Sequence, residues 1–194
     1  MARSSTREEI LSAAAALFAT VGYKGTSLQD IAGAVGCSKA TLLYHFATKE
    51  VILATLVAPP VRDLATLVDT LEGLSADAAR ERTIEGFVDL VLTYRREIAL
   101  IFHDLPYLLH APSFADLKEL IDHLAAVLAG GTGDPAALVG VQVIMAGVAL
   151  VAVDPLGPDG VDARAALIGV ARRALVPGPD QPLTPSKTRS PRKK

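Results

Sequence analysis

Residues 36–49 read Gly-Cys-Ser-Lys-Ala-Thr-Leu-Leu-Tyr-His-Phe-Ala-Thr-Lys. Ser38 is a favourable N-cap residue, and Leu42 and Phe46 share one face of a helix, so this stretch predicts a short helix that buries both side chains. The same helix exposes polar side chains, namely Lys39, Thr41, Tyr44 and His45. Thr48 should then cap a further helix and place Glu50 in its first turn, where the helix dipole favours a carboxylate.

We expect another helix near the start of the chain. It should open at Ser5 or Thr6, with Glu8 or Glu9 completing a capping box, and it should end at Gly22. Its apolar stripe consists of Ile10, Ala14, Leu17 and Val21, with Leu11 and Phe18 beside it.

A helix should also begin after Ser27, because Asp30 is correctly spaced to complete a capping box with it. Its buried side chains are expected to be Leu28, Ile31 and Val35. Gly36-Cys37 then makes a tight turn into the helix that Ser38 caps. Two helices joined in this way form a helix-turn-helix, so residues 6–57 predict a compact four-helix unit.

Pro59-Pro60 should end or bend the helix that starts at Thr48 near Val57, because a proline pushes the preceding residue out of the helical region. Helical periodicity continues downstream without a convincing strand pattern, so the predicted fold class is all-α. Further helices are expected over residues 61–72, 80–95, 97–110, 113–129, 135–153 and 162–175. Glycine-rich and proline-containing breakers separate them, namely Gly130-Gly131-Thr132-Gly133 and Leu156-Gly157-Pro158.

The composition is that of a globular protein, because 51% of the 194 residues are hydrophobic and 21% are charged. The net charge of −2 is unevenly distributed, with +1 over residues 1–50, −7 over residues 51–175 and +4 over residues 176–194. Cys37 is the single cysteine, so no internal disulfide can form, which fits a reducing cytosol. The polar N-terminus has no apolar signal core, and we expect a cytoplasmic protein.

Residues 136–153 are long enough to raise the question of a membrane span, since Gln142 is their single polar side chain. The segment is rich in Ala, Gly and Val and has no flanking lysine or arginine anchors, so we favour a helix covered by protein on all sides. Ala136, Gly140 and Gly147 would allow another helix to approach closely. We therefore expect the helices over residues 135–153 and 162–175 to form a homodimer interface, and we expect no membrane contact.

A short helix with exposed polar side chains suits the major groove of DNA. Lys39 and Thr41 are the candidate base-reading residues, and Ala40 permits contact with a thymine methyl group. Candidate contacts to the DNA backbone are Thr26, Ser27, Ser38, Tyr44, His45 and Lys49. Each has a second interpretation, since the serines cap helices with or without DNA and the lysines are also compatible with ordinary solvent exposure.

Residues 80–130 combine apolar stripes with scattered polar side chains, which describes either a small-molecule pocket or a plain core. The candidate ligand-binding residues are Phe87, Val91, Tyr94, His103, Tyr107, His110, Phe114, Leu117, Ile121 and Met145. Too few metal-ligating side chains accompany the two histidines to predict a metal site. Neither a phosphate loop nor a nucleophile–base pair is recognisable, so we expect no cofactor and no enzyme activity.

The run from Gly22 to Glu50 resembles the DNA-binding domain of TetR (tetracycline-repressor-like) regulators. The resemblance is carried by Gly22-Tyr23-Lys24-Gly25-Thr26-Ser27, Ile31-Ala32, Gly36-Cys37-Ser38-Lys39 and Leu43-Tyr44-His45-Phe46-Ala47-Thr48-Lys49-Glu50. It implies a homodimeric repressor whose affinity for its double-stranded DNA operator falls when a small molecule binds the C-terminal part. Two departures are Leu43, where many members have a tyrosine, and Pro59-Pro60, where members usually keep a continuous helix.

The predicted organisation is therefore a helix-turn-helix DNA-binding domain over residues 1–57 and a helical ligand-binding and dimerisation domain over residues 58–176. Residues 177–194 carry five prolines and a basic cluster and predict a disordered tail, either solubilising or attracted nonspecifically to DNA. The expected function is a transcriptional repressor released from its operator by a small, largely apolar ligand. The alternative is a helical ligand-binding or scaffold dimer without operator specificity.

Overall fold

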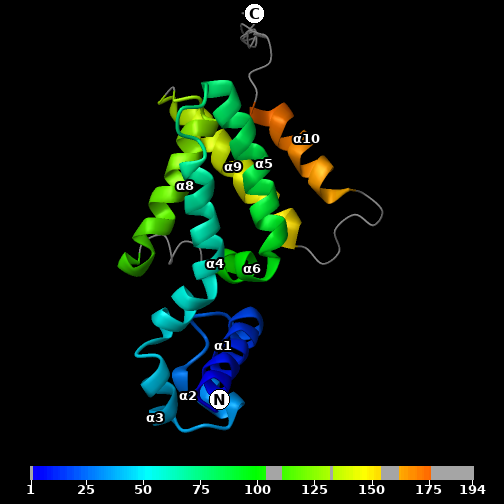
Figure 1. Ribbon diagram of the computed structural model, residues 1–194. Helices are drawn as coiled ribbons and strands as arrows, with labels where there is room; N and C mark the ends of the chain where they lie inside the picture. The colour runs from blue at the N-terminus through cyan, green and yellow to red at the C-terminus, as the bar shows by residue number, and fades with distance from the viewer. Residues whose placement is uncertain (1, 104–110, 132, 154–161, 176–194) are drawn as a thin grey trace, which may run out of the picture.

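The computed structural model describes residues 2–103, 111–131, 133–153 and 162–175, and within these ranges every regular element is a helix. The lower unit in Figure 1 contains three helices and the start of a fourth. These are α1 (Ala2–Val21), α2 (Leu28–Val35), α3 (Lys39–His45) and α4 (Lys49–Asp69). The upper unit contains α5 (Ala76–Thr93), α6 (Arg95–His103), η1 (Pro112–Phe114), α8 (Ala115–Leu128), α9 (Pro135–Val153) and α10 (Ala163–Leu175). The all-α prediction is confirmed.

The predicted caps of the helix-turn-helix are confirmed. Ser27 caps α2 and forms a capping box with Asp30, and Ser38 and Thr48 cap α3 and α4. Gly36 ends α2 in the left-handed conformation with φ of 75°, which a residue without a Cβ adopts at low cost. These local rules set the directions of the helices that lead into and out of α3.

The predicted start of the first helix is wrong, because α1 begins at Ala2 rather than at Ser5 or Thr6. An N-cap residue contributes only about 1 kcal/mol. The preceding residues include neither proline nor glycine, so nothing in them prevents the helix from extending by another turn.

Pro59-Pro60 was expected to end or bend a helix, and the structure excludes the first outcome, since α4 runs without interruption from Lys49 to Asp69. Each proline removes one backbone N–H donor and clashes with the preceding turn. Burial of Val57, Pro60 and Leu64 against neighbouring helices offsets this loss. The axis of α4 nevertheless changes direction along its length in Figure 1, which is the bend that the prolines predict. The predicted domain boundary at residue 57 therefore falls inside one helix.

The downstream helices follow the expected order. The helix predicted over 135–153 is α9 with the same bounds, and α10 starts one residue later than predicted. α5 starts earlier than expected because Ser75 caps it, and η1 precedes α8. α6 accounts for the first part of the helix expected over 97–110, and the rest of that segment lies outside the described residues, as do residues 156–158 and the tail.

Helix α5 is the centre of the upper unit and packs against α4, α8, α9 and α10. Gly86 permits a close approach to α4, because a Cβ at this position would lie 2.4 Å from Cδ1 of Leu67. A side chain at position 86 would therefore require the Leu67 side chain to move.

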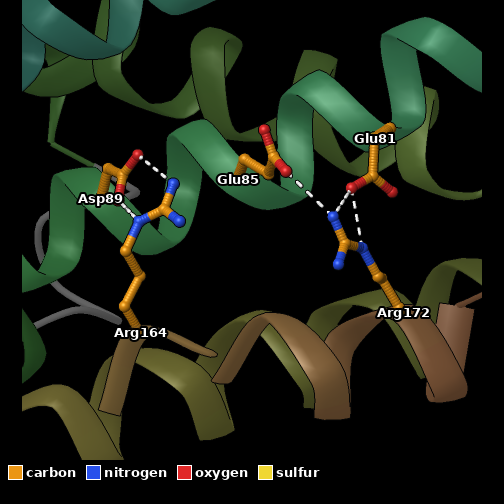
Figure 2. Close-up of polar contacts among 5 residues, drawn as sticks. All are labelled: Glu81, Glu85, Asp89, Arg164 and Arg172. Atoms are coloured by element: carbon orange, nitrogen blue, oxygen red, sulfur yellow. Dashed lines mark hydrogen bonds and ion pairs between the residues drawn. The ribbon is translucent and has the colours of Figure 1, made fainter. Parts of the chain in front are cut away.

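A row of acidic side chains on α5 holds α10 in place (Figure 2). Arg164 binds Asp89 through two hydrogen bonds, with Nε 2.6 Å from Oδ1 and Nη2 2.9 Å from Oδ2. Arg172 binds Glu81, with Nε 2.7 Å from Oε1, and its Nη2 is 2.9 Å from Oε1 of Glu85. The hydrogen bond from Arg172 lowers the pKa of Glu81, and that from Arg164 lowers the pKa of Asp89. The sequence analysis did not predict this cluster.

Among the described residues of one chain, helix α9 is covered on one side only. Val141, Met145 and Val148 are buried, whereas Val139, Val143 and Leu150 on the opposite side are 58%, 64% and 59% exposed. The expectation that protein covers this helix on all sides is therefore not met by one protomer. By length and apolar composition alone both α4 and α9 are long enough to cross a membrane, and both pack against several other helices of the chain.

Candidate nucleic-acid interface and cavity

Helix α3 is anchored by one face and exposed on the other. Leu42 and, just after the helix, Phe46 are completely buried in the core of the lower unit. The exposed side chains are Lys39, Ala40, Thr41, Leu43 and Tyr44. Tyr44 has 70% of its surface exposed, compared with 42% for Leu43. The apolar anchor therefore fixes the direction in which a row of polar groups faces outward.

Two hydroxyl groups at the start of α3 are linked to each other. Ser38 Oγ accepts a hydrogen bond from the backbone N–H of Thr41 at 3.0 Å, and it lies 2.9 Å from Thr41 Oγ1. Both residues are exposed. The cap thus holds the Thr41 hydroxyl in one position on the surface of the helix.

Tyr44 and His45 lie next to each other at the end of α3. Their rings meet edge to face, with 5.3 Å between the centroids. His45 is half-buried, whereas Tyr44 is exposed. The contact restricts the orientation of the exposed tyrosine ring.

Thr26 does not have the surface position that the sequence predicted. Its side chain is 2% exposed, and its hydroxyl donates to the carbonyl oxygen of Gly22 at 2.8 Å. Its backbone N–H donates to the same carbonyl. The physical reason is that Gly22 follows α1, where carbonyl groups need donors from outside the helix. Thr26 therefore has no group left for a phosphate.

Lys49 also differs from its predicted role as an outward-facing cation. Its ammonium donates to the carbonyl oxygens of Tyr23 and Thr26, at 2.5 and 2.7 Å. It also lies 4.2 Å from the centroid of the Tyr23 ring. The half-buried lysine thus joins the first turn of α4 to the segment between α1 and α2. Tyr23, which precedes α2, was not predicted to contact Lys49, although both its ring and its backbone carbonyl do so.

Ser27 is exposed at the start of α2, but its polar groups are engaged within the chain. Its backbone N–H and hydroxyl donate to Asp30 Oδ2 at 2.8 and 2.7 Å. The bond from the Ser27 hydroxyl is the main reason that the pKa of Asp30 is lowered. Ser27 therefore serves the helix cap first, and contact with a phosphate would require rearrangement of that cap.

A cavity of about 480 Å³ lies in the upper unit among α4, α5, α6, α8 and α9. Five of the residues expected to bind a ligand line it, namely Phe87, Val91, Leu117, Ile121 and Met145. The sequence analysis missed the contributions of Pro60, Phe102 and Gln142. These missed residues come from three different helices, so no single helical stripe could identify them together.

Two other expected ligand-binding residues lie elsewhere. Tyr94 does not line the cavity, because its hydroxyl donates to Asp63 Oδ2 at 2.6 Å and links the end of α5 to α4. Phe114 is the last residue of η1 and is buried in the core. The side chain of His103, together with Tyr107 and His110, lies outside the described residues. Among the side chains that are described, no three His, Cys, Asp or Glu residues are grouped to hold a metal ion.

The fold and the exposed α3 surface are those of a helix-turn-helix protein. Residues 10–56 match the family model for bacterial regulatory proteins of the tetR family. The transcriptional regulator RutR of Escherichia coli (strain K12) is 34% identical over 134 residues, which cover 66% of this chain and 62% of RutR. The repressor KstR2 of Rhodococcus jostii (strain RHA1) is 28% identical over 120 residues, covering 61% of this chain and 59% of KstR2.

Solved structures have the same arrangement of helices. Mycobacterium smegmatis AmtR is 29% identical with a TM-score of 0.59, over 90% of this chain and 87% of AmtR. AibR, solved in complex with isovaleryl coenzyme A and operator DNA, shares the fold at 21% identity with a TM-score of 0.63, over 88% of this chain and 98% of AibR. Residues 10–56 belong to the TetR family of DNA-binding domains, and most of the chain shares the fold of TetR-like regulators. It spans less than two thirds of the length of the curated relatives RutR and KstR2.

Proposed function

We propose that this protein is a transcriptional repressor that binds operator DNA as a homodimer and releases it when a small, largely apolar ligand enters the cavity. The observation that carries this proposal is the α3 surface. Buried Leu42 and Phe46 hold a short helix whose outer side is lined with hydrogen-bonding groups. This geometry allows the helix to enter a major groove while its anchor stays in the protein core.

Within this proposal, the exposed residues of α3 divide into two groups. Lys39 and Thr41 read base edges, and Ala40 leaves room for a thymine methyl group. Ser38, Tyr44 and His45 bind the DNA backbone and fix the register of α3. Ser27 contributes at the edge of the surface. Thr26 and Lys49 support the domain from inside and make no direct contact with DNA.

The exposed side of α9 supports the homodimer. Val139, Val143 and Leu150 form an apolar stripe that no other described helix of the chain covers. A second copy related by a two-fold axis would bury the same stripe from both protomers. It would also place the two α3 helices about 34–36 Å apart, which is one turn of DNA.

The cavity supports regulation by a ligand, because α4 connects its wall to the DNA-binding unit. Pro60 and Leu64 of α4 line the cavity, while Lys49 at the start of the same helix binds the segment before α2. A ligand that favours another position of α4 would therefore change the spacing of the two α3 helices, which is a shift between populations. AibR is a related protein solved with both a small molecule and operator DNA. A cytoplasmic location follows from this function.

Footprinting of the purified protein on the DNA upstream of its own gene tests the proposal. We expect a protected site with two-fold symmetry, and we expect the same protection from a variant that lacks residues 177–194. If deletion of this basic tail abolished all binding, the alternative of a scaffold dimer without operator specificity would be correct. The tail would then be the sole source of DNA affinity.

A further inference from the structure

Few of the described side chains that line the cavity are polar. Among the described lining residues, all are apolar except Lys118, Asp122 and Gln142. Lys118 and Asp122 belong to α8 and Gln142 belongs to α9, whereas α4, α5 and α6 contribute apolar side chains only. A ligand in the cavity would therefore meet hydrogen-bonding groups from α8 and α9 and only apolar side chains from α4, α5 and α6.

The two charged side chains of the described lining neutralise each other. The ammonium of Lys118 donates to Asp122 Oδ2 one helical turn away on α8. The two side chains are 50% and 57% exposed, so the pair lies where the cavity meets solvent. No other lysine, arginine, aspartate or glutamate is among the described residues that line the cavity. The described part of the lining therefore carries no net charge.

A charged group that entered the apolar part of the cavity would lose its hydration without gaining an unpaired opposite charge from the described lining residues. Burial of an ionised group in that way costs several kcal/mol. A carboxylate placed beside Lys118 would also approach Asp122, and an ammonium placed beside Asp122 would approach Lys118. A neutral group avoids both penalties, because Lys118 can donate to it, Asp122 can accept from it and the Gln142 amide can do either.

From these observations we infer that the cavity selects an uncharged molecule with an apolar body and one hydroxyl or carbonyl end, which Lys118, Asp122 and Gln142 bind. Its volume is within the range of about 300–1,000 Å³ typical of small-molecule sites. The inference rests on the proposed function only in naming this molecule as the effector. The Lys118–Asp122 pair is then the group that determines ligand charge.

Three probes that share one decyl chain test the inference, namely decan-1-ol, decanoate and decylammonium. Binding is measured at neutral pH by isothermal calorimetry on the full-length protein, below the concentration at which the ionic probes form micelles. We expect decan-1-ol to bind more tightly than either ion, by a factor of about ten or more, since each factor of ten needs only 1.4 kcal/mol.

Substitutions that leave one charge unpaired should change the order of affinities. Asp122→Asn frees Lys118 and should make decanoate the preferred probe, whereas Lys118→Met frees Asp122 and should make decylammonium the preferred one. Asp116→Asn is the matched control, because Asp116 is exposed in the first turn of the same helix and does not line the cavity. It makes the same change in net charge and should preserve the preference for decan-1-ol.

The inference is overturned if the unmodified protein prefers either ion, if none of the probes binds, or if Asp122→Asn keeps the original order. The calorimetric measurement contains no DNA. If decan-1-ol binds but does not release the operator, the proposed regulation is wrong while the chemistry of the cavity stands. If operator binding itself is absent, the repressor proposal is wrong without any effect on the ligand measurements.

Discussion

The ammonium of Lys49 lies 4.2 Å from the centroid of the Tyr23 ring, and it donates to the backbone carbonyl of the same tyrosine. A second bond runs to the carbonyl of Thr26. One side chain thus joins the start of α4 to the segment that leads into α2. This contact determines how α2 and α3 are held on the helix that continues into the cavity wall.

Replacement of this lysine should destabilise the DNA-binding unit rather than remove a DNA contact. For Lys49→Met we expect a loss of about 1–3 kcal/mol, because the carbonyls of Tyr23 and Thr26 lose a charged donor. Affinity for all DNA sequences should fall, while the dependence of affinity on salt concentration stays unchanged. Chemical denaturation and anisotropy titrations at several salt concentrations measure the two quantities. A flatter salt dependence would mean that Lys49 binds phosphate after all.

Lys39 and Thr41 should determine which sequence is bound. Lys39→Ala or Thr41→Ala should cost about 1–3 kcal/mol at the base pair that each residue reads, with little effect on nonspecific DNA. Arg173→Ala is the control for Lys39→Ala, because Arg173 is an exposed cation on α10, far along the chain from α3. Anisotropy titrations with operator variants measure the effect. Equal losses on all sequences would contradict the assignment of these residues as base readers.

The bend at Pro59-Pro60 should matter for the response to ligand. Pro59→Ala restores one backbone donor to α4, and Pro59 does not line the cavity. We expect α4 to straighten and the ligand to become less effective in releasing DNA, without a change in its affinity for the cavity. The measurement compares operator release with calorimetric binding of the same ligand. If release is unchanged in Pro59→Ala and in the double variant Pro59→Ala/Pro60→Ala, the bend has no part in transmission.

The apolar stripe of α9 should hold the dimer together. Val143→Asp would place a carboxylate in the middle of the proposed interface, so we expect monomers in analytical ultracentrifugation. Leu74→Asp is the control, since Leu74 is also an exposed large apolar residue but lies between α4 and α5. Operator affinity should fall with dimerisation in the first variant only. A Val143→Asp protein that remains dimeric would place the interface elsewhere.

Acidification should loosen α10 from α5. The folded-state pKa values of Glu81 and Asp89 are lowered by hydrogen bonds from Arg172 and Arg164. Their contribution to stability is therefore fully present above the unfolded-state values and is lost as the pH falls below about 4. We expect the melting temperature to fall in this range, as followed by circular dichroism.

The variant Arg172→Gln tests the origin of this pH dependence. It should have a lower melting temperature at neutral pH and a smaller further decrease on acidification. Arg173→Gln is the matched control, because Arg173 is not part of the cluster drawn in Figure 2. Identical pH dependence in all three proteins would show that other carboxylates are responsible.

The sequence predicts well what depends on neighbouring residues. The caps Ser27, Ser38 and Thr48 act within one helical turn, and each occurs where expected. Contacts between residues far apart in the chain could not be predicted in this way. Lys49, for example, donates to carbonyl groups more than twenty positions earlier in the chain. The same limit applies to the cavity, where the apolar stripes of α5 and α8 were recognisable but Pro60, Phe102 and Gln142 were not.

Because the exposed valines of α9 would form the dimer interface, operator occupancy by the proposed repressor would depend on the concentration of protomers. With dimerisation through this stripe, the concentration of the DNA-binding species rises with the square of the protomer concentration as long as most chains are single. Occupancy of the operator would therefore change steeply over a narrow range of expression levels. A protein that represses its own synthesis in this way would settle near that threshold, where small amounts of ligand have the largest effect on transcription.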